Sequence, residues 1–146
     1  MSHAAPAHHF GDKAGLLTAV ATDGFRRLAA TLRQAHQASG SFLEVGVAYV
    51  RFAVTHRAHF EVMFRPELYR PDDPELVAAR DEARSLLYPP AAEAANTPDG
   101  SGDARAGVAA WSLVHGLATL WLNHNLPPQL GDDPEQITRE VAHYLY

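Results

Sequence analysis

Two histidines lie on apolar faces of segments with helical periodicity, and they are the first candidates for chemistry in this sequence. His56 ends an apolar series, spaced by three and four residues, that begins at Phe42, and His115 lies inside the uncharged run 106–122. A neutral imidazole buried on such a face costs free energy unless its ring nitrogens find hydrogen-bond partners. Each histidine is therefore either a core residue with satisfied nitrogens or an orienting polar group in an apolar ligand pocket.

Metal binding is a third role open to these histidines. His56 and His59 have a spacing that places both rings on one face of a helix, and His115 would have to converge on them from another helix. No carboxylate or cysteine at ligand spacing accompanies them. We therefore expect no metal and no other cofactor, and we treat zinc, nickel or haem binding as the weaker alternative.

The motifs of common enzyme classes are absent from the sequence. It has no G-x-S-x-G elbow, no P-loop and no H-E-x-x-H motif. The pairs Asp72-Asp73 and Asp132-Asp133 each precede a proline, where helix caps belong. The chain contains no cysteine, which excludes disulfide frameworks, thiolate zinc sites and cysteine nucleophiles. The sequence favours a binding protein over an enzyme.

The segments that must position these residues read as helices throughout. Stretches rich in Pro, Gly and Asp at 65–74, 97–103 and 126–134 divide the helical runs, and no strand pattern of any length occurs. Ser41 and Glu44 have the spacing of a capping box. We expect the first helix to begin after Phe10-Gly11, with Asp12 as its cap, and to end near Gly40. Further helices should begin at residues 42, 58, 74, 104 and 134.

Two of the expected helices are apolar around most of their circumference. The helix from Phe42 belongs at the centre of a bundle, and the helix over 104–123 should meet the core with one face and a partner with another. Small residues such as Gly107 and Gly116 indicate close approach of a crossing helix or, at Gly116, a ligand. The last two helices predict a four-helix dimer interface, formed by Val114, Ala118, Trp121, Ile137, Val141 and Tyr144.

The charge and hydropathy of the sequence limit the classes of partner that the chain can bind. A formal net charge of -5 gives no dominant electrostatic affinity for nucleic acid. The start of the chain, Met1 to Pro6, lacks the basic residues and apolar run of a signal peptide. Ser112, His115 and Thr119 interrupt the uncharged run, which favours a buried helix over a membrane span. We expect a cytoplasmic protein without a membrane partner.

Two separated motifs resemble the TetR family of transcriptional regulators. Residues 8–17 (HHFGDKAGLL) resemble the junction where the recognition helix of that family ends and its fourth helix begins, although Ala7 stands where the family usually has tyrosine. Residues 49–53 (YVRFA), followed by His56 and Met63-Phe64, and residues 111–116 (WSLVHG) resemble its WHG-type ligand-binding domain. Together the two matches cover most of the chain.

The resemblance implies an all-α fold, a TetR-type C-terminal helical bundle. Residues 12–146 would be the ligand-binding and dimerisation domain, and residues 1–11 a remnant of the helix-turn-helix recognition helix. The effector would be a small apolar molecule. By the same resemblance, the residues lining its pocket are Phe52, His56, Phe60, Met63, Trp111, His115 and Thr119.

The resemblance also indicates what the chain lacks. The family places about 40 to 50 further residues ahead of this point, and a helix-turn-helix needs its first helix to brace the recognition helix. The remnant would contribute the DNA-contacting residues Ser2, His3, His8 and Lys13. A start codon assigned too far downstream would explain the difference, because GTG encodes valine internally and methionine at a start.

The sequence is compatible with two functions. The first is a homodimeric regulator, most simply a repressor, that binds a DNA operator only when the complete helix-turn-helix is present. The second is a naturally truncated ligand-binding or interaction module without DNA binding of its own, which would pair with a full-length relative. The sequence identifies neither the effector nor the operator.

Overall fold

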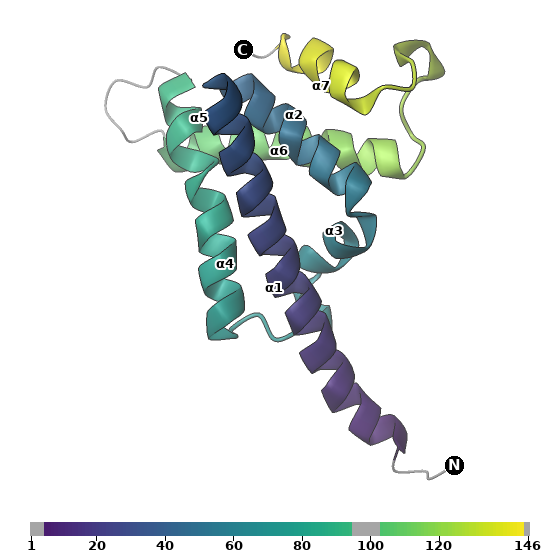
Figure 1. Cartoon of the computed structure of the whole chain (residues 1–146). Helices are drawn as coiled ribbons and strands as arrows, with labels where there is room; N and C mark the ends of the chain where they lie inside the picture. Colours follow the sequence, from purple (N-terminus) through teal and green to yellow (C-terminus); the bar gives the residue numbers. More distant parts are fainter. Residues whose placement is uncertain (1–4, 95–102, 145–146) are drawn as a thin grey trace.

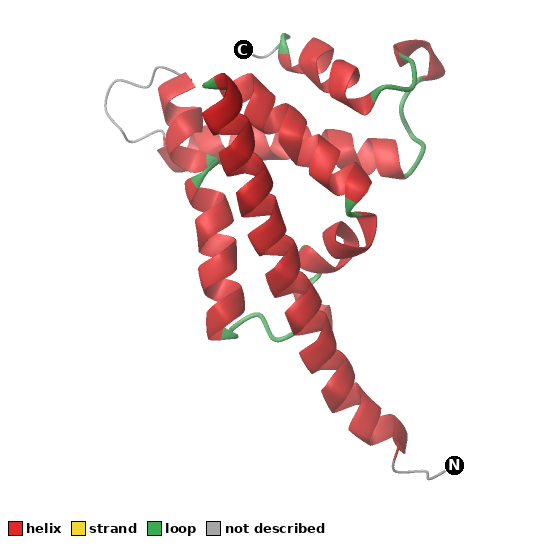
Figure 2. Cartoon of the chain, in the orientation of Figure 1, coloured by secondary structure: helices red, strands yellow, loops and turns green. Residues whose placement is uncertain are grey.

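The computed structural model describes residues 5–94 and 103–144, with side chains described over 12–91 and 104–144. All regular structure in these residues is helical (Figures 1 and 2). The helices, in chain order, are α1 (Ala5–Ser39), α2 (Phe42–Thr55), α3 (Arg57–Met63), the 3-10 turn η1 (Pro66–Leu68), α4 (Pro74–Ser85), α5 (Tyr88–Ala94), α6 (Asp103–Leu122), the 3-10 turn η2 (Pro128–Leu130) and α7 (Pro134–Ala142). The expected all-α fold is confirmed.

Helix α2 lies at the centre of the arrangement, as its apolar circumference predicts. It contacts α1, α3, α6 and α7, and its buried side chains are Val45, Val47, Ala48, Tyr49, Val50, Phe52 and Ala53. A helix that is apolar all round gains free energy only when neighbours cover every side of it. Helix α2 is therefore the common packing partner of α1, α3, α6 and α7, whereas α4 packs mainly on α1 and α5 on α6.

Helices α1 and α4 run side by side, and α1 continues well beyond the end of α4 (Figure 1). Exposed ion pairs join them, between Arg26 and Glu75 and between Arg33 and Glu82. On the other side of the molecule Arg139 of α7 binds both carboxylate oxygens of Glu44 at 2.9 and 3.0 Å. The two exposed pairs contribute little free energy, whereas the bidentate pair of Glu44 and Arg139 is partly buried.

Three predicted helix starts are confirmed by their caps. The side chains of Ser41, Asp73 and Asp133 accept hydrogen bonds from backbone N–H groups in the first turns of α2, α4 and α7. Only half of the capping box forms, because Glu44 turns outward to Arg139 while the Ser41 N–H donates to the Ser39 hydroxyl. Gly40 ends α1 with a φ of 63°.

The predicted start of the first helix is wrong. We expected Asp12 to cap it, whereas α1 begins at Ala5 and passes through Gly11 and Asp12 without interruption. Asp12 is therefore inside the helix, and no break separates residues 5–11 from the rest of α1. Gly11 and Asp12 each cost only about 1 kcal/mol or less inside a helix relative to alanine, so they do not have to end or start one.

The polar helix after Asp73 ends earlier than its prolines suggest. Helix α4 stops at Ser85, and α5 begins at Tyr88 with Pro89 and Pro90 in its first turn, where proline is tolerated. The short break at residues 86–87 turns α5 toward α6. A Cβ on Gly107 of α6 would overlap the ring of Tyr88, so this glycine allows the two helices to meet. The expected close approach at Gly107 is confirmed.

The same expectation fails at Gly116 within a single chain. A Cβ built there meets no atom within 4 Å, so neither a crossing helix nor a side chain of the described chain uses the space.

None of the described helices has the length and the apolar character that a membrane span requires.

Candidate functional site

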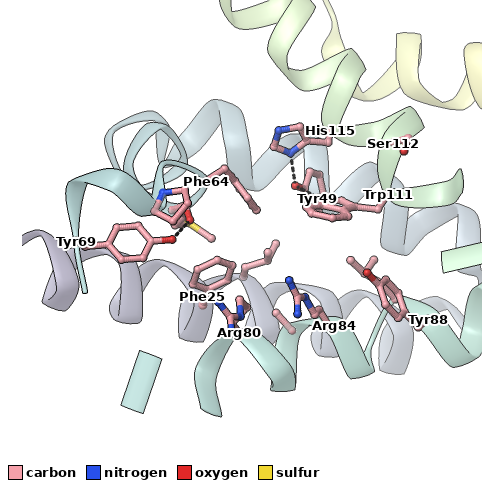
Figure 3. Close-up of a pocket in the computed structure, with 15 residues that line it drawn as sticks. Phe25, Tyr49, Phe64, Tyr69, Arg80, Arg84, Tyr88, Trp111, Ser112 and His115 are labelled. Atoms are coloured by element: carbon pink, nitrogen blue, oxygen red, sulfur yellow. Dashed lines mark hydrogen bonds between the residues drawn. The ribbon is translucent and has the colours of Figure 1, made fainter. Parts of the chain in front are cut away.

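A cavity of about 390 Å³ opens between the central helix and the α1–α4 pair (Figure 3). Helices α1 to α6 all contribute to its wall, together with the turn η1. The lining residues are Phe25, Leu28, Tyr49, Met63, Phe64, Pro66, Tyr69, Arg80, Ala83, Arg84, Leu87, Tyr88, Trp111, Ser112 and His115. Mostly apolar and aromatic, with a few polar groups, this lining is typical of small-molecule sites.

One wall carries a chain of three hydrogen-bonded side chains from α2 and α6. The indole Nε1–H of Trp111 donates to the Tyr49 hydroxyl at 2.9 Å, and that hydroxyl lies 2.7 Å from Nδ1 of His115. Since an indole can only donate, the hydroxyl accepts from Trp111 and its own proton is available to His115. This order makes Nδ1 of His115 the acceptor and places the proton of the neutral ring on Nε2.

Burial favours this neutral arrangement. Desolvation lowers the pKa of His115 and raises the pKa of the Tyr49 hydroxyl, although the Trp111 hydrogen bond opposes the second shift. The three side chains are therefore uncharged near neutral pH. They form a fixed polar seam on an otherwise apolar wall.

Aromatic rings surround this seam. Phe64, at the end of α3, packs edge-on against His115 with ring centres 4.6 Å apart and also contacts Phe25, Phe60 and Trp111 at 5.2 to 6.0 Å. Such edge-to-face contacts add to the free energy gained by burial. Phe64 thereby links α1, α3 and α6 at the cavity, a position that our sequence prediction of the lining missed.

The opposite wall, on α4, carries two arginines. Arg80 and Arg84 lie across the cavity from Tyr49, Trp111 and His115 (Figure 3). The Nε atom of Arg80 is buried and has no hydrogen-bond partner. Neither arginine was predicted from the sequence, because their helix is polar and contains Asp81 and Glu82, which is the pattern of a solvated face.

Three of the seven predicted lining residues line the cavity, namely Met63, Trp111 and His115. Phe60 lies directly behind them, with its ring centre 5.0 Å from that of His115. Phe52 packs on His56 instead, and the Thr119 hydroxyl donates to the His115 carbonyl within α6. A role of these last residues in ligand binding stays a prediction.

Of the three histidines considered for metal binding, only His56 and His59 lie close together, with ring centres 5.9 Å apart. His59 Nε2 lies 3.0 Å from Asp23, which also accepts from Arg27, and the ring of His56 stacks near His59. His115 belongs to the separate seam with Tyr49. Desolvation, followed by the charges of His59 and Arg27, lowers the pKa of His56. Within the described residues no three potential ligands are placed to hold a metal ion.

The predicted interface residues fall into two groups. Val114, Ala118 and Ile137 are buried within one chain, and Trp121 and Val141 are half-buried against the same core. Tyr144 is 87% exposed.

Of the predicted DNA contacts, Lys13 is exposed on α1 and His8 lies in α1 without a described side chain, while Ser2 and His3 lie outside the described residues.

Comparison with known proteins identifies the family of the chain and a similar solved structure. The family model of the tetracyclin repressor-like C-terminal domain matches residues 42–145. A solved structure titled as a protein with unknown function from Rhodococcus sp. RHA1 is similar, with a TM-score of 0.75 and 32% sequence identity. That match covers 99% of this chain and 76% of the other. No curated protein matches the sequence.

Proposed function

The chain belongs to the family of tetracyclin repressor-like C-terminal domains, and on this premise we propose that it is the sensing and dimerising part of a transcriptional regulator. The observation that carries the proposal is the aromatic cavity between α2, α4 and α6. Its volume of about 390 Å³ suits one small molecule. In this proposal the cavity binds the effector, and effector binding releases the repressor from DNA.

The cavity supports such a role because it joins helices that a ligand could displace. Phe25 and Leu28 of α1 form one side and Trp111 of α6 another, so a ligand contacts both the helix nearest the N-terminus and the proposed dimer helix. An effector shifts the regulator only if it binds the non-DNA-binding conformation more tightly. Coupling of effector and DNA binding is commonly worth about 1 to 3 kcal/mol.

The second part of the proposal is a homodimer through the face of α6 that the chain leaves uncovered. Val108 and Leu120 are 47% and 44% exposed, and the open position Gly116 lies between them. This face carries no charged side chain from 106 to 122. A second copy of α6 would bury it, with Tyr144 beyond the end of α7 at its margin.

Ligand binding is tested with N-phenyl-1-naphthylamine, a neutral probe that fluoresces when it is buried. We expect saturable binding to the wild-type chain. Ala83→Phe, which fills the cavity from α4, should lower the affinity at least about tenfold. Ala78→Phe, on the exposed face of the same helix, is the matched control and should bind like wild type. Equal binding by all three proteins would contradict the cavity as the site.

Dimerisation is tested by light scattering after size exclusion. Wild type should have twice the chain mass, and Leu120→Arg with Gly116→Arg should have the mass of one chain. Leu130→Arg changes a leucine of similar exposure on η2 and should remain dimeric. A monomeric wild type would refute this part of the proposal.

The DNA-binding part is tested by the intact mass of the untagged protein from its native cell. We expect a mass larger by about 40 to 50 residues, enough to complete a helix-turn-helix. A mass matching a chain of 146 residues would instead favour the truncated module, which senses a ligand and pairs with a relative.

A further inference from the structure

The arginines on α4 carry information about the ligand that the proposed function does not use. Arg80 and Arg84 are one helical turn apart and both line the cavity. The buried Nε atom of Arg80 has no partner, and a buried donor without an acceptor costs free energy. Neither guanidinium takes part in an ion pair among the described residues.

The other arginines near α4 are arranged differently. Arg26 and Arg33 of α1 reach the Glu75 and Glu82 carboxylates on the outer face of α4. Those pairs use two of the acidic groups of the helix. Among the described residues that line the cavity there is no Asp or Glu, so no carboxylate of the lining pairs with the half-buried Arg80 or with the exposed Arg84.

Two hydroxyls of the cavity wall are already engaged within the protein. The Tyr49 hydroxyl is engaged with Trp111 and His115, and the Tyr69 hydroxyl donates to the backbone carbonyl of Met63. These groups are neutral near pH 7, and their hydrogen bonds lie within the wall. An anion arriving with the ligand would supply the acceptors that Arg80 lacks.

We propose that the effector is an amphiphilic anion, with an apolar ring or chain body and one carboxylate or similar oxyanion bound by Arg80 and Arg84. This inference rests on the proposed function of the cavity and narrows its ligand class. The planar guanidinium groups match the paired oxygens of a carboxylate. Phe25, Phe64 and Leu87 receive the apolar body.

A matched pair of fluorescent probes tests the charge directly. 8-Anilinonaphthalene-1-sulfonate and N-phenyl-1-naphthylamine share one aromatic body and differ by a sulfonate. We expect wild type to bind the anionic probe at least about tenfold more tightly than the neutral one. Equal affinities would overturn the anion inference while leaving the cavity as a binding site. Failure of both probes to bind would overturn the proposed function as well.

Substitution assigns the preference to the two arginines. Arg80→Gln with Arg84→Gln should lower the affinity for the anionic probe about tenfold or more and leave the neutral probe within about twofold. Arg57→Gln with Arg105→Gln removes the same total charge from exposed positions outside the lining and should change neither affinity. Equal effects of the two double variants would show a general charge effect and overturn the site.

Two further measurements distinguish loss of the anion site from misfolding and from anion binding by His115. Arg80→Lys with Arg84→Lys retains both charges and should keep part of the preference for the anion, which a merely misfolded variant would not. The preference should also persist from pH 6 to 8.5, because a guanidinium stays charged throughout. A preference that appeared only in acid would assign the anion to a protonated His115 and overturn the role of the arginines.

Discussion

The two walls of the cavity treat their polar atoms in opposite ways. On the α2–α6 wall, the Tyr49 hydroxyl accepts a hydrogen bond from Trp111 and donates one to His115. Burial keeps Tyr49 and His115 uncharged near neutral pH. On the α4 wall, Arg80 keeps a buried N–H without an acceptor, and Arg84 lies beside it. The first wall is complete without a ligand, whereas the second is not.

This difference separates structural from recognition residues within one cavity. A satisfied polar network fixes the side chains that form it and specifies one arrangement of the core. A buried N–H without an acceptor, such as Nε of Arg80, is instead costly in the free protein and gains a hydrogen bond when an acceptor arrives. We therefore expect substitutions on the first wall to change stability and those on the second to change binding.

The largest effect is expected where the walls are joined. Gly107→Val places a side chain in the space that the ring of Tyr88 occupies, and overpacking of this kind costs about 3 kcal/mol. The melting temperature, followed by circular dichroism, should fall by roughly 10 °C. Gly15→Ala is the control, since its Cβ would meet only ordinary contact and should stabilise α1 slightly. A Gly107→Val protein as stable as wild type would mean that α5 does not rest on α6.

A smaller loss is expected from the hydroxyl of the first wall. Tyr49→Phe leaves the Trp111 N–H and the His115 acceptor unpaired, which should cost about 2 kcal/mol in a urea unfolding experiment. Tyr144→Phe removes an exposed hydroxyl and should leave the free energy of unfolding unchanged. If both variants matched wild type, the hydrogen-bonded seam would not be a stabilising element.

A pH-dependent effect of the same wall should be smaller still. Because desolvation lowers the pKa of His115 in the folded chain, the unfolded chain binds the proton first. The contribution of neutral His115 is therefore complete above about pH 7 and is lost as the pH falls below the unfolded value of about 6.5. Between pH 7.5 and 5.5, the melting temperature should fall by a few degrees more in wild type than in His115→Gln. Equal falls in both proteins would remove His115 as the titrating group.

The smallest change in stability is expected on the second wall. Arg80→Met removes the unpartnered Nε and keeps much of the apolar stem, so the free energy of unfolding without ligand should not fall and should rise by at most about 1 kcal/mol. A loss comparable with that of Tyr49→Phe, measured in the same urea titration, would erase the distinction between the walls.

Local signals in the sequence predicted much of the fold. Ser41, Asp73 and Asp133 cap helices where expected, because a cap is formed by neighbours along the chain. The start of α1 was not predicted, since Asp12 is a cap-forming residue placed inside a continuous helix. Likewise the break at residues 86–87 comes before the prolines, where tertiary contact with α6 decides the direction of the chain.

The candidate site was harder to predict for a physical reason. The family resemblance brought Trp111 and His115 to the cavity, whereas periodicity identifies only the apolar face of a helix. It could not tell which part of α2 faces that space, and Tyr49 does so while Phe52 and His56 pack elsewhere. Arg80 could not be identified either, because only coordinates show that its Nε is buried and unpaired.

Because α1 is long, a small tilt of this helix at the cavity moves its N-terminal end by a larger distance. The helix has 35 residues, and from Phe25, which lines the cavity, to Ala5 it extends about 30 Å at 1.5 Å per residue. A rigid rod of that length that tilts by about 5° about Phe25 moves its far end by about 2.6 Å. Adjustments at the cavity too small to disturb its packing are thus magnified into displacements at Ala5 close to the diameter of a water molecule.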